Sequence, residues 1–303
     1  MKVLLTGGAG FIGTNVARKL IGSGVEVVAI GRRPCPIDGV ENVVVPRLDL
    51  SEFNGVMSRH GVTIVYHLAA AGVHPSDRDL SELVRVNTLL PVDVVTAAKA
   101  HGAKAVVLMG SSAEYAAQAV TMLDESMALE TQRIYGATKA AGGLVALATG
   151  VQHQLPVALL RAFNIYGANE AAHRLLPSLA SKLARRESVD LSLGTQVRDF
   201  VYVDDACDAL VLAAQALIDG RMATGAYNVS TGIGTPVAEF ARTVARVLRV
   251  DESLLRFGAL PLRPDDLPMV VGDPGRIQRA TGWRAAYSLE QGITGALERL
   301  VLN

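Results

Sequence analysis

The stretch VLLTGGAGFIG, residues 3–13, decides the fold of this chain. An apolar run at residues 2–5 predicts a buried strand, and residues 11–22 predict a helix directly after the glycines. Two glycine spacings fit the turn between them, G-x-G-x-x-G at Gly8, Gly10 and Gly13, and G-x-x-G-x-x-G at Gly7, Gly10 and Gly13. Such glycines let backbone N–H groups approach a pyrophosphate at the helix N-terminus. The alternative is a tight turn without a ligand, but the place of the glycines after a first strand favours a dinucleotide site.

Strand and helix patterns alternate through the first half of the chain. We expect buried strands at residues 2–5, 25–30, 42–46, 63–68, 105–109 and 157–161, and helices at segments such as 11–22, 79–101 and 135–153. Short β-branched runs separated by helices indicate a parallel sheet covered on both faces. The expected fold class is therefore α/β, a Rossmann-type doubly wound parallel sheet.

The pattern loosens beyond Asn164, and we expect a smaller C-terminal lobe there. Its elements are expected at 173–186, 189–193, 227–230, 236–249 and 289–301. Asp204 and Asp205 are expected to cap the helix that follows them. Residues 1–164 would form the dinucleotide-binding Rossmann domain, residues near 196–231 would pack back onto it, and residues 165–303 would form mainly the substrate lobe.

Composition excludes several kinds of partner. The chain has 303 residues, is 50% hydrophobic, and carries 29 Lys and Arg against 29 Asp and Glu, so neither nucleic acid nor an acidic membrane is an expected partner. Two cysteines make no disulfide framework, and the six histidines show no metal-ligand spacing. No apolar run reaches about 18 residues, and the N-terminus turns to glycine too soon for a signal peptide. We expect a cytoplasmic protein.

The end of the second expected strand bears on the choice of dinucleotide. An NAD site usually has an acidic residue about 20 residues after the glycines, bound to the ribose 2′-hydroxyl. Here the sequence AIGRRP has Gly31 at that place, followed by Arg32 and Arg33. Guanidiniums suit a 2′-phosphate, which favours NADP over NAD. The alternative is that the two arginines belong to a solvated basic loop with no ligand.

Reductive chemistry is indicated by the stretch RIYGATKA, residues 133–140. Tyr135 and Lys139 lie one turn apart on one face of an expected helix. Tyrosine can give a proton to a carbonyl oxygen, and a nearby ammonium stabilises the phenolate that remains. Ser111 and Ser112 follow the fifth strand, at the edge of the sheet where ligands bind. A dinucleotide sensor of the same fold has no need of this combination, so an enzyme is favoured.

These motifs resemble those of the extended short-chain dehydrogenase/reductases, of the nucleotide-sugar epimerase/dehydratase/reductase type. The similarity runs through TGGAGFIG, LDL (48–50), HLAA (67–70), SS (111–112), YGATK (135–139), RAFNIYG (161–167) and RDFVYVDDA (198–206). It implies that Ser111, Tyr135 and Lys139 are catalytic. It implies a cofactor site made of Gly7, Gly10, Phe11, Ile12, Gly13, Arg32, Arg33, Asp49, Leu50, Leu68, Ala69, Ala70, Asn87, Phe163, Tyr135 and Lys139. It implies substrate contacts from Ser112, Asn164, Arg198 and Arg263.

Differences from relatives at single positions indicate which reaction of the family this chain catalyses. Related sugar 4,6-dehydratases have an acid where this chain has Ala113, and Glu114 is expected to point away, so a dehydratase is disfavoured. Arg32 and Arg33 favour a reductase that exchanges NADPH over an epimerase that retains NAD, and the tail at 262–283 resembles reductases of nucleotide-linked 4-keto-6-deoxy sugars. The expected function is NADPH-dependent reduction of such a sugar, with a nucleotide-sugar 4-epimerase as the alternative. The resemblance also implies a homodimer formed through the helices at 79–101 and 135–153.

Overall fold

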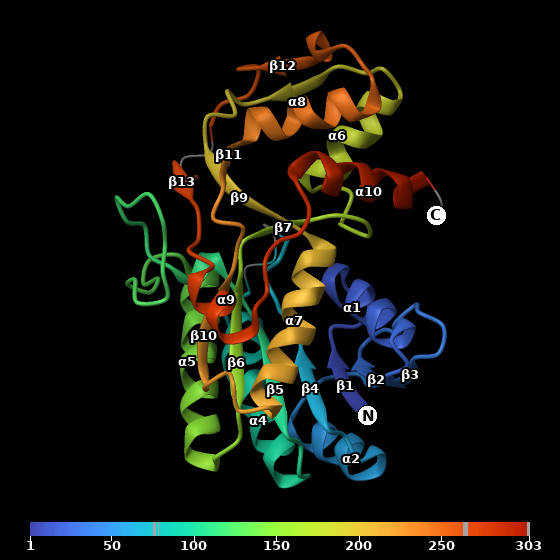
Figure 1. Cartoon of the computed structure of the whole chain (residues 1–303), viewed down its shortest axis with the longest axis vertical. Helices are drawn as coiled ribbons and strands as arrows, with labels where there is room; N and C mark the ends of the chain where they lie inside the picture. Colours follow the sequence, from blue (N-terminus) through green and yellow to red (C-terminus); the bar gives the residue numbers. More distant parts are fainter. Residues whose placement is uncertain (75–76, 78, 263–265, 302–303) are drawn as a thin grey trace.

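The computed structural model describes residues 1–74, 77, 79–262 and 266–301. Figure 1 shows that the chain forms a larger lower part and a smaller upper region. The lower part is built on a seven-stranded sheet in the order β10-β6-β5-β4-β1-β2-β3, with every neighbouring pair parallel. Its strands are β1 (Lys2–Thr6), β2 (Glu26–Gly31), β3 (Glu41–Val44), β4 (Ile64–His67), β5 (Ala105–Ser111), β6 (Val157–Ala162) and β10 (Gly225–Val229). This arrangement confirms the expected doubly wound α/β fold.

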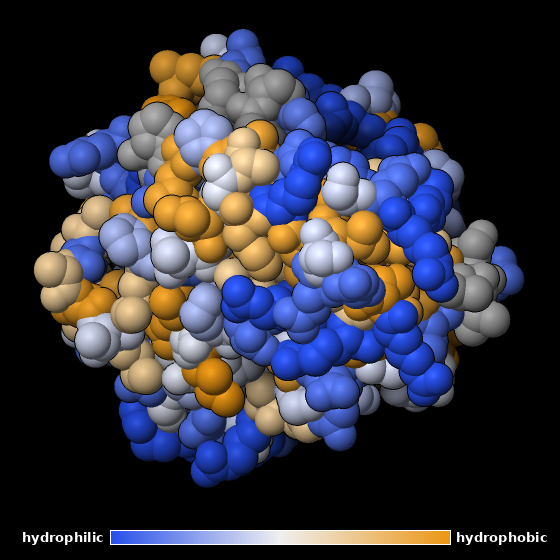
Figure 2. All heavy atoms as spheres, turned by 90° about the horizontal axis from the view of Figure 1, so that it is seen from above, coloured by the Kyte–Doolittle hydropathy of each residue, from blue (hydrophilic) through white to orange (hydrophobic). Residues whose placement is uncertain are grey.

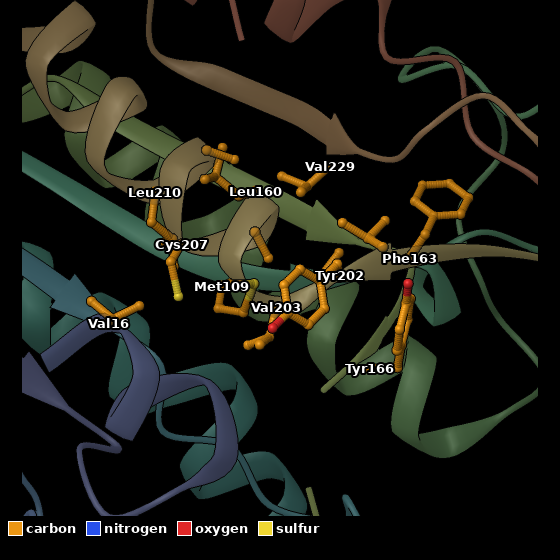
Figure 3. Close-up of a cluster of buried hydrophobic side chains, with 14 of the residues drawn as sticks. Val16, Met109, Leu160, Phe163, Tyr166, Tyr202, Val203, Cys207, Leu210 and Val229 are labelled. Atoms are coloured by element: carbon orange, nitrogen blue, oxygen red, sulfur yellow. The ribbon is translucent and has the colours of Figure 1, made fainter. Parts of the chain in front are cut away.

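Side chains alternate between two hydrophobic cores, one on each face of the sheet. Val3 and Leu5 pack with α1 (Phe11–Gly22) and α7 (Val203–Ile218), as Figure 3 shows for Val16, Met109 and Cys207. Leu4 packs on the other face with α2 (Leu50–His60), α4 (Leu90–Ala100) and α5 (Ile134–His153). Because both faces are covered, the central strands such as β5 and β6 are continuous hydrophobic runs, whereas the edge strand β3 is largely exposed.

The helix expected at 79–101 has an irregular middle. It consists of α3 (Leu80–Val84), a π-helical turn at Arg85–Leu89 and then α4. A single π-turn of this kind shifts the helical register and is frequent near functional sites.

A smaller upper region stands over the carboxyl edge of the large sheet (Figure 1). It contains a small sheet of β7 (Asn164–Tyr166), β9 (Val197–Tyr202), β11 (Gly234–Pro236) and β13 (Met269–Val270), a pair formed by β8 (Val189–Leu191) and β12 (Leu255–Phe257), and helices α6 (Leu175–Ala184), α8 (Val237–Leu248) and α10 (Leu289–Val301). Its surface mixes hydrophilic and apolar side chains (Figure 2). After β9 the chain returns to the large sheet as α7 and β10, and after β13 it returns a second time as the short helix α9 (Gly275–Thr281).

The expectation that Asp204 and Asp205 cap α7 is wrong. The N-cap of α7 is Tyr202, and the helix has no side-chain cap. Asp204 instead forms an ion pair with Arg299 of α10, and Asp205 accepts hydrogen bonds from the backbone of Ala286 and Tyr287. The two acids therefore anchor the C-terminal segment, not their own helix.

Among the helices that the structure describes, none is long and apolar enough to cross a membrane.

Candidate active site

A first cavity, of about 560 Å³, lies along the glycine loop at the carboxyl ends of β1, β2 and β4. It is lined by most of the residues expected to hold a dinucleotide, namely Gly7, Gly10, Phe11, Ile12, Gly13, Arg32, Arg33, Leu68, Ala69 and Ala70. The structure thus gathers residues from three sequence segments into one cleft at the edge where such sheets bind ligands.

The glycine loop leaves the first turn of α1 open. Gly7 has φ +74°, and a Cβ on Gly13 would lie 2.1 Å from the carbonyl oxygen of Gly7, so neither position accepts a side chain. The N-cap of α1 is Gly10, which supplies no side-chain cap to the first-turn N–H groups. Uncapped donors and the helix dipole make this end of α1 attractive to an anion.

Buried hydrogen bonds of Thr6 support the wall of this cavity that Leu68 and Ala69 form. The Thr6 hydroxyl accepts hydrogen bonds from the N–H groups of Leu68 and Ala69, at 3.2 Å each, and lies 2.8 Å from Nδ1 of His67. The Thr6 proton is then directed to Nδ1, which assigns the remaining imidazole hydrogen to Nε2. Burial, assisted by the charge of Lys139, lowers the pKa of His67 to about 3, so the imidazole is neutral.

A second cavity, of about 470 Å³, continues from the first toward the upper region. It brings together the three residues expected to be catalytic, Ser111, Tyr135 and Lys139, with four others that were singled out from the sequence: Ser112, Phe163, Asn164 and Arg198. These side chains come from β5, α5, the loop after β6, β7 and β9. The cavity is therefore the place where the large sheet faces the upper region.

Close packing fixes the serine loop against α5. Ser111 ends β5, and its Oγ accepts from the N–H of Ala113 at 3.1 Å, which starts the short turn Ser112–Glu114. The carbonyl oxygen of Ala113 reaches so close to α5 that a Cβ on Gly136 would lie 2.0 Å from it. Gly136 is therefore what lets the serine turn sit beside Tyr135.

Lys139 is buried beneath this loop. Its Nζ donates to the carbonyl oxygen of Met109 at 2.6 Å. Burial lowers the pKa of Lys139, and the carboxylate of Glu114 opposes that shift. A positive charge at this depth acts strongly on its neighbours, because little water screens it.

Glu114 points away from the second cavity, as expected from the sequence. It is fully buried, and its Oε2 accepts from Nε of Arg161 at 2.9 Å. The physical reason is this ion pair below the turn, together with the hydrogen bond from the Ser111 N–H to Oε1 of Glu114. Glu114 therefore holds the serine loop and has no access to the cavity.

Arg198 is mostly buried at the upper wall. It forms an ion pair with Asp266 and also donates to the carbonyl of Val197 at 2.8 Å. Asn164 is exposed at the same wall. Arg263, the other expected phosphate ligand, lies outside the described residues.

Three residues expected at the cofactor do not line either cavity. Asp49 caps α2 by accepting from the N–H of Glu52 at 3.0 Å, and Leu50 is the first residue of that helix. Asn87, on the π-helical turn, bonds both backbone groups of Ala71 and the hydroxyl of Thr138. Asn87 thus ties the cavity wall to α5 from behind.

Two residues at the junction of the cavities were not found from the sequence. Glu170 and Arg174 lie in the loop before α6 and line both cavities. Burial raises the pKa of Glu170 to about 7, although the charge of Arg174 opposes it. No periodicity marks these residues, and the only signal was an acid after RAFNIYG, in the segment YGANEA.

Comparison with known proteins agrees with this geometry. Residues 3–230 match the model of the NAD dependent epimerase/dehydratase family. The chain belongs to this family. The membership confirms the expected resemblance, and with it an enzyme of the oxidoreductase type whose relatives act on nucleotide sugars.

Individual relatives include both epimerases and synthases. The chain is 30% identical to UDP-glucose 4-epimerase of Azospirillum brasilense, with 96% of this chain and 89% of that protein covered. It is 24% identical to CDP-abequose synthase of Salmonella muenchen, with 96% and 95% covered. Among solved structures, MoeE5 in complex with UDP-glucuronic acid and NAD superposes with a TM-score of 0.86 at 30% identity, covering 100% of this chain and 99% of that one.

Proposed function

We propose that this enzyme reduces the keto group of a nucleotide-linked 4-keto-6-deoxy sugar with NADPH. The observation that carries the choice is the end of β2, where Gly31, Arg32 and Arg33 line the first cavity without a carboxylate among them. A reductase exchanges its cofactor in every turnover and draws on NADPH, which carries a 2′-phosphate. A basic site at the end of β2 suits that phosphate.

The chain's residues fit a dinucleotide along the two cavities. The open first turn of α1 would take the pyrophosphate, and the wall of Leu68, Ala69 and Ala70 would lie along the cofactor. Arg32 and Arg33 are exposed and would pair with a 2′-phosphate. Asp49 would contact the adenine while it caps α2. Asn87 would support the cofactor site by holding the backbone of Ala71.

The nicotinamide, when bound, supplies the hydride. Tyr135 gives the proton to the sugar's carbonyl oxygen, and the buried ammonium of Lys139 stabilises the phenolate left behind. The Ser111 hydroxyl donates a hydrogen bond to the same oxygen, where negative charge develops. Ala113 offers no acid or base, and Glu114 is held by Arg161, so neither of these two positions in the serine turn supplies the acid or base that an elimination would use.

The substrate's diphosphate would lie at the upper wall of the second cavity. Arg198 would bind it, with Ser112 and Asn164 near the sugar, and Arg263 is proposed as a second phosphate ligand from its sequence alone. In this assignment residues 1–164, with the segment 196–231, hold the cofactor. Residues 165–303 hold mainly the nucleotide sugar.

We further propose a cytoplasmic homodimer. Leu144, Val145 and Val151 are exposed on α5, and Leu89 is exposed on the neighbouring π-helical turn. Apolar side chains on two adjacent helices favour pairing with a second copy.

The second candidate is an NAD-dependent 4-epimerase. It is favoured by the 30% identity to a UDP-glucose 4-epimerase and by the similarity to MoeE5, which was solved with NAD. The same Tyr135, Lys139 and Ser111 would serve it, because epimerisation removes and returns one hydride.

One experiment distinguishes the two reactions. The purified protein is incubated with NADPH and a panel of nucleotide-linked 4-keto-6-deoxyhexoses, and the sugars are identified by NMR, with Tyr135→Phe as the inactive control. Consumption of NADPH with a reduced sugar as product supports the reductase. In a parallel incubation with UDP-glucose and no added reductant, formation of its 4-epimer would favour the epimerase.

A further inference from the structure

The two cavities meet at a shared wall that any extended ligand must cross. Phe11 and Ile12 at the start of α1 line both cavities, and so do Glu170 and Arg174 from the loop before α6. If one end of a dinucleotide lies at Arg32 and the other at Tyr135, as the proposed function requires, its middle passes this wall. Glu170 and Arg174 are the charged residues of the shared wall.

Glu170 sits at this wall without a fixed partner for one oxygen. Its Oε2 is buried and has no hydrogen-bond partner, whereas Arg174 is exposed. The loop that carries Glu170 is tied to α1, because Nδ2 of Asn15 donates to the carbonyl of Ala168 at 3.0 Å. A buried carboxyl oxygen without a partner is costly, so a ligand that supplies one gains affinity.

Charged and titratable side chains from several elements line the two cavities that Glu170 also lines. The first turn of α1 brings no charged side chain, and its own loop brings Arg174 and His173. The second cavity is also lined by Tyr135 and Lys139 of α5 and by Arg198 and Asp266 of the upper wall. The first cavity is also lined by Arg32, Arg33, Glu82 and Arg85. Of these, Arg174 is the group whose charge acts on the Glu170 carboxyl. A backbone hydrogen bond from Gly167 also favours the carboxylate, and burial outweighs both effects on the pKa.

We propose that Glu170 takes up one proton from solvent when the dinucleotide binds and, as the neutral acid, donates a hydrogen bond to the cofactor's pyrophosphate. An ionised carboxylate at the shared wall would repel that pyrophosphate, which lies at the open end of α1. The neutral acid removes the repulsion and finds a partner for Oε2. Glu170 thus makes cofactor affinity depend on pH. The inference rests on the dinucleotide site of the proposed function.

The pKa of Glu170 gives the direction of the pH dependence. In the free protein it is raised by burial to about 7, and a bound anion raises it further. Below this pH the acid is already neutral and affinity is constant. Above it, each pH unit costs about tenfold in affinity until the higher pKa of the complex is reached.

Isothermal titration calorimetry with NAD⁺ tests this, because NAD⁺ has no 2′-phosphate that would titrate itself. Wild type is titrated from about pH 6 to about pH 9 in two buffers of different ionisation enthalpy, so that proton uptake is measured directly. We expect uptake that approaches one proton between the pKa of the free protein and the higher pKa of the complex, and binding about 10- to 30-fold weaker at the alkaline end. Glu170→Gln, which resembles the neutral acid, is expected to bind at all pH values as wild type does at low pH.

Controls separate Glu170 from its neighbours. His173→Asn, which removes the imidazole of the same loop, should keep the wild-type slope. An unchanged slope in Glu170→Gln, its loss in His173→Asn, or binding of NAD⁺ by wild type without proton uptake would overturn the proposal. If Glu170→Gln does not fold, the proton uptake of wild type still decides. Binding of NAD⁺ without pH dependence overturns this inference alone, whereas no binding of NAD⁺ or NADP⁺ at any pH overturns the proposed function with it.

Discussion

Lys139 on α5 and Met109 on β5 are joined by a 2.6 Å hydrogen bond from Nζ to the carbonyl oxygen. Met109 lies two residues before Ser111, and Tyr135 lies one turn before Lys139 on the same helix. One buried bond therefore fixes the distance between the strand that carries the serine and the helix that carries the tyrosine. A side chain that is both buried and charged is held in few positions, which suits a site that must be arranged before the substrate arrives.

Tyr135→Phe is expected to lower turnover by about 10²- to 10⁴-fold, because the proposed proton donor is lost. Folding and cofactor affinity should stay near wild type. Tyr287→Phe is the matched control, because that tyrosine is exposed and lines neither cavity. Steady-state kinetics and dinucleotide titration measure both effects, and near-wild-type turnover in the Phe variant would refute the assignment.

Arg32→Ala/Arg33→Ala is expected to abolish a preference for NADPH over NADH. In wild type we expect that preference to be about tenfold to a few hundredfold, because the exposure of both arginines limits the gain from pairing with a phosphate. Fluorescence titration with both cofactors measures it. Arg47→Ala, an exposed arginine outside the cavity, is the control. Tighter binding of NADH by the wild type would contradict the NADP assignment.

Arg198→Ala is expected to weaken binding of the nucleotide sugar by about 10- to 100-fold, because a charge-assisted bond to the diphosphate is lost and Asp266 is left facing the cavity. Binding of NADPH should change little. Arg256→Ala removes an exposed arginine of the same region, paired with Asp190, and should leave both affinities unchanged. Equal loss for cofactor and substrate would mean that Arg198 acts through the fold.

Gly136→Ala is expected to inactivate the enzyme and to destabilise it by roughly 1–3 kcal/mol. The new Cβ would lie 2.0 Å from the carbonyl of Ala113, so the serine turn or α5 must move. Gly22→Ala is the matched control, because a Cβ there meets nothing within 4 Å. Urea unfolding and turnover measure the two effects, and a fully active Gly136→Ala would show that the serine turn tolerates displacement.

Much of this architecture could be predicted because its determinants are local. The strands at 105–109 and 157–161 are continuous apolar runs, since the sheet is covered on both faces, and the glycine loop and the spacing of Tyr135 and Lys139 are short-range patterns. The parallel sheet then brings the ends of its strands to one edge. That is enough to collect Ser111, Tyr135 and the glycines around adjoining cavities.

The remainder depends on contacts that local patterns do not encode. Asp205 bonds Ala286 and Tyr287, which are about eighty residues away, so a cap on its own helix was the wrong expectation. Asn87 lies on a π-helical turn and holds the backbone of Ala71, a contact that the sequence pattern does not encode. Glu170 belongs to an irregular loop, which a hydrogen bond from Asn15 of α1 to the carbonyl of Ala168 helps to hold in place.

Glu170→Gln is expected to stabilise the fold at alkaline pH and to have little effect in acid. The pKa of Glu170 is raised from its ordinary 4.5 to about 7 in the folded state, so the folded protein binds more protons than the unfolded chain between these values. Its stability must therefore fall as the pH rises through this range, by about 3 kcal/mol in all. Glutamine carries no charge and avoids this loss. Urea unfolding of wild type and variant at about pH 5 and about pH 8 measures it, with the exposed Glu290→Gln as control. A variant that is less stable than wild type at alkaline pH would mean that the carboxylate is compensated in the folded protein.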